Sequence, residues 1–189
     1  MKNREGKTAL LMMDMQNGIV SRYAEKEEVL LPFQKALETA RANDIPVFFV
    51  RIGFSEGYPE IHSNNKMFSA ISESGGMTLS DESTQIHESM KQRENEPTIT
   101  KYRVSAFAGS NLEVILRAQG IDTLVLSGIA TSGVVLSTIR EAADKDFSLT
   151  VLKDACLDRD PEVHQVLTDK VFPRQSEVIT VDEWTDTLD

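Results

Sequence analysis

The run Thr8-Ala9-Leu10-Leu11-Met12-Met13, followed directly by Asp14, decides the fold class. All but the first residue of the run are apolar, which is typical of a strand buried on both faces. A strand with one face in water would alternate apolar and polar residues instead. The run therefore predicts a strand of a parallel sheet that is covered on both sides, with Asp14 at its carboxyl end.

Further strands alternate with helices along the chain. Short apolar runs predict strands at 46–51, 98–101, 123–128, 149–152 and 178–181. Apolar residues at helical spacing predict helices after Pro32, after a capping-box pattern at Ser110 and Glu113, over 132–145, and from Asp160-Pro161. Such alternation implies right-handed crossovers and a mostly parallel sheet with helices on both faces.

Length and charge limit the possible functions. The 189 residues are expected to form one domain, residues 1–189. The 20 Lys and Arg against 30 Asp and Glu give a formal charge of −10, the wrong sign for binding nucleic acid or an anionic membrane surface. No apolar run approaches the roughly 20 residues that span a bilayer, and no cleavage-site pattern is evident, so a cytoplasmic protein is expected.

Cysteine and histidine are scarce. Cys156 is the only cysteine, which excludes an intrachain disulfide. The three histidines, His62, His87 and His164, lie too far apart in the sequence to form a local ligand motif. We therefore expect no metal site and no other cofactor.

Residues 52 to about 96 lack the regular patterns of the rest of the chain, with only weak periodicity near 67–71 and 86–90. Long irregular segments in compact domains are commonly functional loops or lids. We expect residues 53–80 to fold over the carboxyl edge of the sheet, with Phe54 or Tyr58 near a ligand.

Three predicted strands end on residues with chemical capacity. These are Asp14, Lys101 and the small-residue turn at 128–133, which enters a helix. In open parallel sheets the ligand crevice lies beyond the carboxyl ends of the strands. An acid or base, a cation and a set of backbone donors able to hold an oxyanion would then share one edge.

Each feature also has a purely structural interpretation. Asp14 could bond the turn at 16–18, a common use of Asp after a strand. Lys101 could be a solvated lysine at a strand end. The glycines of the 128–133 turn could serve only the close packing of helix on strand. The combination of the three features favours a functional site.

The segments 10–17, LLMMDMQN, 101–107, KYRVSAF, and 128–135, GIATSGVV, resemble in order and spacing the signature blocks of the isochorismatase-like (cysteine hydrolase) superfamily. Residues 51–54 and 154–158 extend the resemblance over nearly the whole chain. It implies a three-layer, Rossmann-like α/β/α fold with a six-stranded parallel sheet, assembled as a homodimer or larger homo-oligomer. It also implies a small-molecule substrate, an amide, a urea or a vinyl ether.

The resemblance assigns roles to particular positions. Asp14 corresponds to the family's general acid or base, and Lys101 to its catalytic lysine. The Ile129-Ala130 bond falls on one that is typically cis and helps to shape an oxyanion hole. The turn Thr131-Ser132-Gly133 would supply backbone donors to that hole. Side chains expected to contact substrate are Gln16, Phe54, Tyr58 and Phe107.

The chain departs from the family at the nucleophile. The family's cysteine would stand where this chain has Val134, which offers no lone pair, proton or charge. Cys156 lies after a later strand, in a segment similar to a structural stretch of the family, and we expect it to be buried. Thr131 and Ser132 carry hydroxyl groups, but no histidine partner is evident for either. Nicotinamidase-like members of the family carry an Asp–His–His metal motif after the second strand. The corresponding region of this chain holds one histidine, His62, which argues against a nicotinamidase.

These residues favour a hydrolase without a thiol nucleophile. True isochorismatases, a branch of the family, also lack the cysteine and use the Asp as a general acid on a vinyl ether. We expect Asp14 to transfer a proton, Lys101 to fix charge on Asp14 or substrate, and the turn at 129–134 to donate hydrogen bonds. The alternatives are an inactive small-molecule-binding member of the family and an amidase with another nucleophile, such as Cys156. Glycine is common at the cysteine position in true isochorismatases, whereas Val134 would narrow and dry the pocket.

Overall fold

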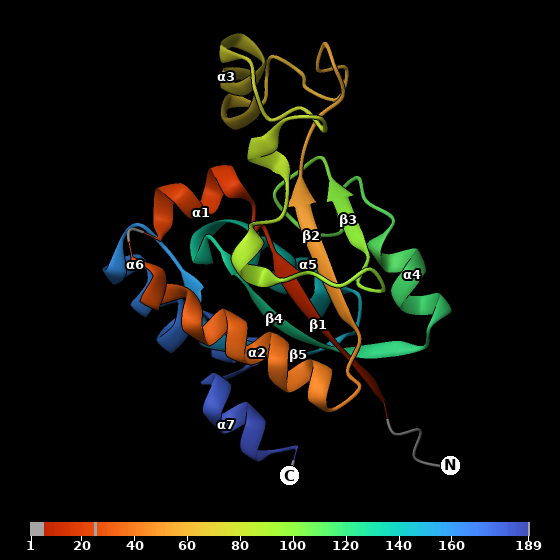
Figure 1. Cartoon of the computed structure of the whole chain (residues 1–189), viewed down its shortest axis with the longest axis vertical. Helices are drawn as coiled ribbons and strands as arrows, with labels where there is room; N and C mark the ends of the chain where they lie inside the picture. The colour runs from red at the N-terminus through yellow and green to blue at the C-terminus, as the bar shows by residue number, and fades with distance from the viewer. Residues whose placement is uncertain (1–5, 25, 189) are drawn as a thin grey trace.

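Six parallel strands form one sheet in the computed structural model, which describes residues 6–24 and 26–188 (Figure 1). The order is β3-β2-β1-β4-β5-β6. The strands are β1 (Lys7–Met13), β2 (Val47–Ile52), β3 (Thr98–Lys101), β4 (Ile121–Ile129), β5 (Ser148–Leu157) and β6 (Glu177–Ile179). Every neighbouring pair is parallel, which confirms the predicted fold class.

Helices cover both faces of this sheet (Figure 1). The α-helices are α1 (Asn17–Tyr23), α2 (Leu31–Ala42), α3 (Lys66–Ser74), α4 (Leu112–Ala118), α5 (Leu136–Asp144), α6 (Pro161–Val166) and α7 (Val181–Asp186). Short 3-10 turns lie at Glu27–Leu30, Glu82–Thr84, Glu88–Met90 and Phe172–Arg174, and π-type turns at Thr131–Val135 and Leu167–Val171. Within the described ranges no helix is both long and apolar enough to cross a membrane.

Strand β1 is buried on both sides, as its sequence predicts. Ala9, Leu11 and Met13 pack into a core with α4 and α5, whereas Leu10 and Met12 pack into a second core with α2 and α7. All five side chains are completely inaccessible to solvent. The strand that carries Asp14 is therefore held in position by two cores at once.

The strand order reverses between β1 and β4. From β1 the chain crosses to β2 on one side and later returns to β4 on the other, and Met13 pairs with both Val50 and Gly128. Ligands of open α/β sheets bind outside the carboxyl ends of the strands at such a switch point. Asp14, the next residue after Met13, stands at this position.

Two elements differ from the sequence prediction. Strand β5 does not end at Leu152 but continues to Leu157, because its last residues pair with the end of β4. The helix predicted over 132–145 is interrupted at its start. Gly133, with φ −99° and ψ −106°, breaks the helical path, and α5 begins only at Leu136.

The capping box predicted at Ser110 and Glu113 is wrong. Glu113 does not return to the start of α4 but forms an ion pair with Lys145 of the neighbouring α5 end, at 2.7 Å. A capping box does occur at Thr180 and Glu183, where it opens α7. Residue 180 was expected to continue the last strand, but β6 is only three residues long.

The long segment between β2 and β3 carries α3, which stands beyond the carboxyl end of β2 (Figure 1). A bridge between Gln16 and Ile86 ties it to the body, and a bridge between Phe54 and Thr78 joins two parts of the segment itself. Phe54 and Phe68 pack with Ile52 in a third apolar cluster. The segment is thus an ordered cover with its own small core.

Candidate active site

Asp14 and Lys101 meet at the carboxyl edge of the sheet. Asp14 follows β1 with φ +57°, a left-handed conformation that Asp tolerates better than most residues, and its backbone N–H donates to Val50 O at 2.8 Å. Lys101 is the last residue of β3. Its Nζ lies 3.0 Å from Asp14 Oδ2, and both side chains are buried. The two charges share one edge of the sheet, as predicted, and form an ion pair there.

Burial makes this an unusual pair of charges. Lys101 Nζ also donates to Arg103 O at 3.1 Å, whereas Asp14 Oδ1 is buried and has no hydrogen-bond partner among the described residues. Loss of solvation raises the pKa of Asp14 above its ordinary 3.8, and the charge and hydrogen bond of Lys101 act in the opposite direction. Asp14 can therefore hold a proton more readily than a surface carboxyl, and Oδ1 is free for a ligand.

The close approach of β4 to β1 brings the second half of the site beside Asp14. A Cβ at Gly128 would lie 2.4 Å from Met13 O, so the approach requires glycine. Strand β4 then ends in the cis peptide bond between Ile129 and Ala130. The structure thus has a cis bond at the position where the family resemblance implies one.

The turn after this bond has fewer free amides than a bare helix start would have. Ser132 N–H donates to Asp158 Oδ2 at 2.7 Å, and Gly133 N–H donates to Ala130 O at 3.1 Å. These two amides already have protein acceptors. Any oxyanion would therefore depend on other donors of the 129–134 turn.

A pocket of about 340 Å³ opens over the ion pair. Its base holds Asp14, Lys101, Ile129, Ala130, Gly133 and Val134. Its walls come from α1, from the end of β2 and the segment after it, and from the loops after β3 and β5; the residues are Ile19, Arg22, Tyr23, Ile52, Met67, Phe68, Ile71, Met77, Val104 and Arg159. Asp14, Lys101 and Val134, the position that the resemblance assigns to the nucleophile, therefore share one mostly apolar cavity.

Gln16 and Phe107, two of the residues expected to contact substrate, do not line this pocket. The Gln16 amide is fully buried, donates to Ile52 O and Thr84 O at 2.8 and 3.1 Å, and accepts from Ile52 N at 2.9 Å. Phe107 packs against Phe147 in the core, with ring centroids 5.7 Å apart. Gln16 ties the cover to β2, and Phe107 belongs to the core.

Phe54 and Tyr58 also lie outside the residues that line the pocket. Phe54 is fully buried behind Phe68, with ring centroids 5.6 Å apart, and the Tyr58 hydroxyl donates to Gly76 O at 3.0 Å. Residues 53–80 do cover the site, as expected. The side chains of this segment that line the cavity include Met67 and Phe68, and not Phe54 or Tyr58.

Thr131 has a histidine partner, contrary to expectation. Its hydroxyl lies 2.8 Å from His164 Nδ1 on α6. The two residues are 33 positions apart, so only the fold reveals the pair. Thr131 is completely buried and does not line the pocket. The pair joins the turn to α6.

Cys156 is buried, as predicted, but it lies within β5, opposite Gly128, and not after the strand. Burial raises the pKa of its thiol to about 12. At neutral pH the group is therefore a thiol, not the thiolate that acts as a nucleophile. It is also absent from the lining of the pocket.

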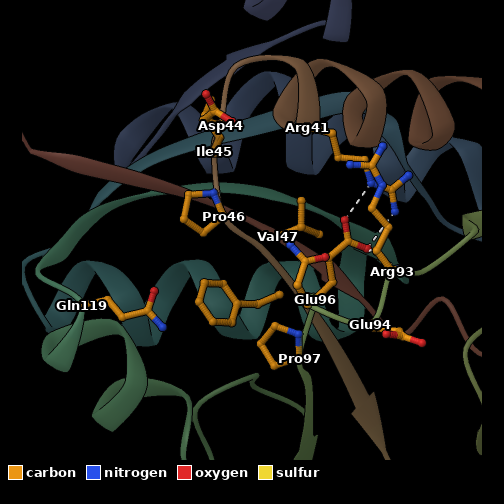
Figure 2. A pocket seen from close by; sticks show the side chains of 12 residues that line it. Arg41, Asp44, Ile45, Pro46, Val47, Arg93, Glu94, Glu96, Pro97 and Gln119 are labelled. Atoms are coloured by element: carbon orange, nitrogen blue, oxygen red, sulfur yellow. Dashed lines mark hydrogen bonds and ion pairs between the residues drawn. The ribbon is translucent and has the colours of Figure 1, made fainter.

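No second group of side chains in the described residues matches the Asp14–Lys101 site as a candidate active site. No three His, Cys, Asp or Glu side chains gather in a way that could hold a metal ion in residues 6–24 and 26–188. A hollow of about 510 Å³ lies at the amino edge of the sheet, beside Pro46 and Pro97 (Figure 2). There Glu96 accepts from Arg41 Nε and Nη2 at 2.7 and 2.8 Å and from Arg93 N at 2.8 Å. These bonds occupy the carboxylate in a structural role.

Comparison with known proteins agrees with this architecture. The model of the isochorismatase domain matches residues 8–183. The uncharacterized isochorismatase family protein YecD of Escherichia coli O157:H7 is 33% identical over 179 residues, 93% of each chain. The ureidoacrylate amidohydrolase RutB of Pseudomonas savastanoi pv. phaseolicola is 29% identical, over 87% of this chain and 76% of that protein. A cysteine hydrolase from Pseudomonas syringae pv. phaseolicola superposes with a TM-score of 0.87 at 20% identity, covering 96% and 92% of the two chains. The chain belongs to the isochorismatase family of hydrolases.

The buried ion pair predicts a pH-dependent loss of stability in Lys101→Met. This change leaves the Asp14 carboxylate buried without a cation, which should cost about 3–5 kcal/mol near pH 8. Because the folded-state pKa of Asp14 is raised, protonation removes the uncompensated charge, so the loss should shrink toward about pH 5. Urea unfolding of wild type and Lys101→Met at both pH values measures this difference in the free energy of unfolding. The double variant Asp14→Asn/Lys101→Met should show little pH dependence, and an equal loss for Lys101→Met at both pH values would contradict the assignment.

Proposed function

We propose that this protein is a hydrolase of a small molecule, cleaving a vinyl ether or an amide- or urea-type C–N bond by Asp14 and Lys101 acid–base chemistry. One observation carries this proposal. Asp14 Oδ1 is buried in a cavity and has no hydrogen-bond partner within residues 6–24 and 26–188, while Oδ2 is held by Lys101 at 3.0 Å. Native structures rarely leave a buried carboxylate oxygen unsatisfied, and a functional role is one of the few explanations.

Protonated Asp14 would act first as a general acid. It donates the proton from Oδ1 to the substrate, to the vinyl carbon or to the leaving nitrogen. A water molecule then adds to the activated carbon and returns a proton to Asp14 as the bond to the leaving group breaks. Lys101 holds Oδ2 in place and stabilises the carboxylate that forms. Free amides of the 129–134 turn donate to developing negative charge on oxygen.

This route is consistent with valine at the position that the resemblance assigns to the nucleophile. Val134 lines the cavity and cannot attack a carbonyl carbon, and Cys156 is buried elsewhere with a raised pKa. Proton transfer followed by attack of water needs no nucleophilic side chain. The amidohydrolase RutB among the relatives supports a C–N bond as one substrate class. A cytoplasmic location and a homo-oligomeric state complete the proposal.

A second candidate is a binding protein that has lost the reaction. Val134 favours it, because an apolar side chain against the catalytic Asp narrows and dries the place where water must attack. If the protein hydrolyses any ligand that stabilises it, the protein is an enzyme and the binding-protein hypothesis is wrong.

Asp14→Asn tests the proposed chemistry. With a substrate found among small amides, ureas and vinyl ethers, the variant should lose about 10²- to 10⁴-fold in turnover, the usual contribution of a positioned acid or base. Wild-type turnover should fall as pH rises through the raised pKa of Asp14, because the acid must be protonated. Asp44→Asn is the matched control, since Asp44 also has a left-handed backbone but is exposed outside the cavity. Full activity in Asp14→Asn would refute the mechanism.

Val134→Cys tests whether the cavity keeps the geometry of a cysteine hydrolase. The new thiol would stand beside Asp14 and Lys101, and an electrophilic amide analogue should then add to it, seen as an increased mass of the intact protein. Wild type should gain no mass, because Cys156 is buried and its thiol has a pKa of about 12. An adduct at Cys156 would instead support the amidase alternative. A folded variant with no adduct would show that the cavity is not shaped for acyl transfer.

A further inference from the structure

The third apolar cluster, which joins the end of β2 to α3, forms one wall of the cavity over Asp14. Six residues belong both to this cluster and to the lining of the cavity. These residues, which together form the apolar wall, are Ile19, Ile52, Phe68, Ile71, Met77 and Val104. The cluster is therefore not closed on itself, because part of its surface faces the cavity.

The apolar wall lies mostly on one side of Asp14. Strands β2 and β3 stand on the same side of β1 in the sheet, and most of the wall comes from the end of β2, from α3 and from the loop after β3 (Figure 1). Between residues 52 and 104 every residue of the lining is apolar except Lys101, whose charge is paired with Asp14. A molecule that extends from Asp14 toward β2 would therefore meet a continuous apolar surface.

Much of the wall is not buried by the chain itself. Ile71, Met77 and Val104 are only half-buried, although each packs against the third cluster. Beside them Met67, which also lines the cavity, is 62% exposed. Apolar surface that a ligand removes from water favours binding roughly in proportion to its area. The wall thus offers a ligand apolar surface that the folded chain leaves uncovered.

Hydroxyl groups of the cover are bonded within the cover. The Tyr58 hydroxyl donates to Gly76 O at 3.0 Å, and the Ser72 hydroxyl donates to Ser69 O at 2.8 Å. Neither Tyr58 nor Ser72 lines the cavity. A polar group of a ligand would lose water at the wall without gaining a hydrogen-bond partner there, which is unfavourable. An apolar group would not incur this loss.

We propose that the substrate carries an uncharged aliphatic or aromatic group that the apolar wall binds, while its hydrolysable bond lies at Asp14. This inference rests on the proposed function and adds the substrate class, a small molecule with one polar reacting end and one apolar end. The cavity of about 340 Å³ is within the size range of small-molecule sites. Met67 and Met77 are flexible and polarizable, so this surface can adapt to groups of different shape.

Straight-chain primary amides from acetamide to hexanamide test this proposal. Binding is measured by NMR titration of wild type labelled with ¹³C at the methionine methyl groups. Affinity should rise by about fourfold for each methylene that the wall buries, which is the usual contribution of a buried CH₂ group. The hydroxyl-terminated amides of the same length as pentanamide and hexanamide should bind about tenfold more weakly than these two, because the wall offers the hydroxyl no partner.

The methionine methyl resonances show where the amides bind. Met67 and Met77 line the cavity, whereas Met90 is buried in the second core with α2. Hexanamide should shift the resonances of Met67 and Met77, assigned with Met67→Leu and Met77→Leu, and leave that of Met90 in place. Shifts confined to other methionines would overturn the proposal.

Val104→Thr and Ile71→Thr each place a hydroxyl group in the apolar wall. Each should weaken the binding of hexanamide by about threefold or more, because the chain then meets a polar group. Acetamide should bind as it does to wild type, since it is too short to reach the wall from Asp14. Val114→Thr is the matched control, because Val114 is 71% exposed on α4 and outside the cavity, and it should change neither affinity.

Two further results would overturn the apolar subsite. One is affinity that does not depend on chain length in folded wild type. The other is equal binding of the alkyl amides and their hydroxyl-terminated counterparts.

Hydrolysis assays separate this inference from the proposed function. Binding that rises with chain length and depends on Val104 and Ile71, without hydrolysis of any amide, urea or vinyl ether by wild type, would support the apolar subsite and refute the hydrolase. Hydrolysis that depends on Asp14 but has the same kcat/KM for short, long and hydroxyl-terminated substrates would support the hydrolase and refute the apolar subsite.

Discussion

The buried ion pair between Asp14 and Lys101 is the interaction on which the site depends. Removing two charges from water costs several kcal/mol per ion, and a pair offsets this cost only with good geometry. Here the 3.0 Å contact joins the ends of β1 and β3, which are separated in the sheet by β2. Packing of β1 between two cores fixes one partner, and the register of β2 with β3 fixes the other. The sheet itself therefore sets the geometry of the pair.

The same burial supports the chemical role that we propose for the pair. The cover formed after β2 places Met67, Phe68 and other apolar side chains over the carboxylate, and the resulting loss of solvation raises the pKa of Asp14. A lysine alone beside the carboxylate would have lowered it. The balance of the two effects yields an acid that can be protonated and deprotonated in place. Binding of a substrate would further exclude water and strengthen each interaction in the cavity.

Local patterns predicted much of this arrangement, and contacts between distant segments account for the rest. The apolar run before Asp14 and the strand before Lys101 indicated where both residues lie, because strands of a parallel sheet end at one edge. The bond between Thr131 and His164 could not be foreseen, since it depends on where α6 packs. Arg159 gave no signal either, because an exposed arginine in a polar segment resembles any surface arginine until the fold places it in the wall of the cavity over Asp14.

The pKa of Asp14 is the property that bears most directly on its proposed role as an acid. It can be measured as the pH titration of the Asp14 ¹³Cγ resonance in protein labelled at aspartate, assigned by comparison with Asp14→Asn. If Asp14 serves as an acid, the midpoint should lie clearly above the ordinary 3.8, because desolvation outweighs the effect of Lys101. A midpoint at or below 3.8 would contradict it, because Asp14 would then be a permanently charged partner of Lys101 and could not serve as the acid.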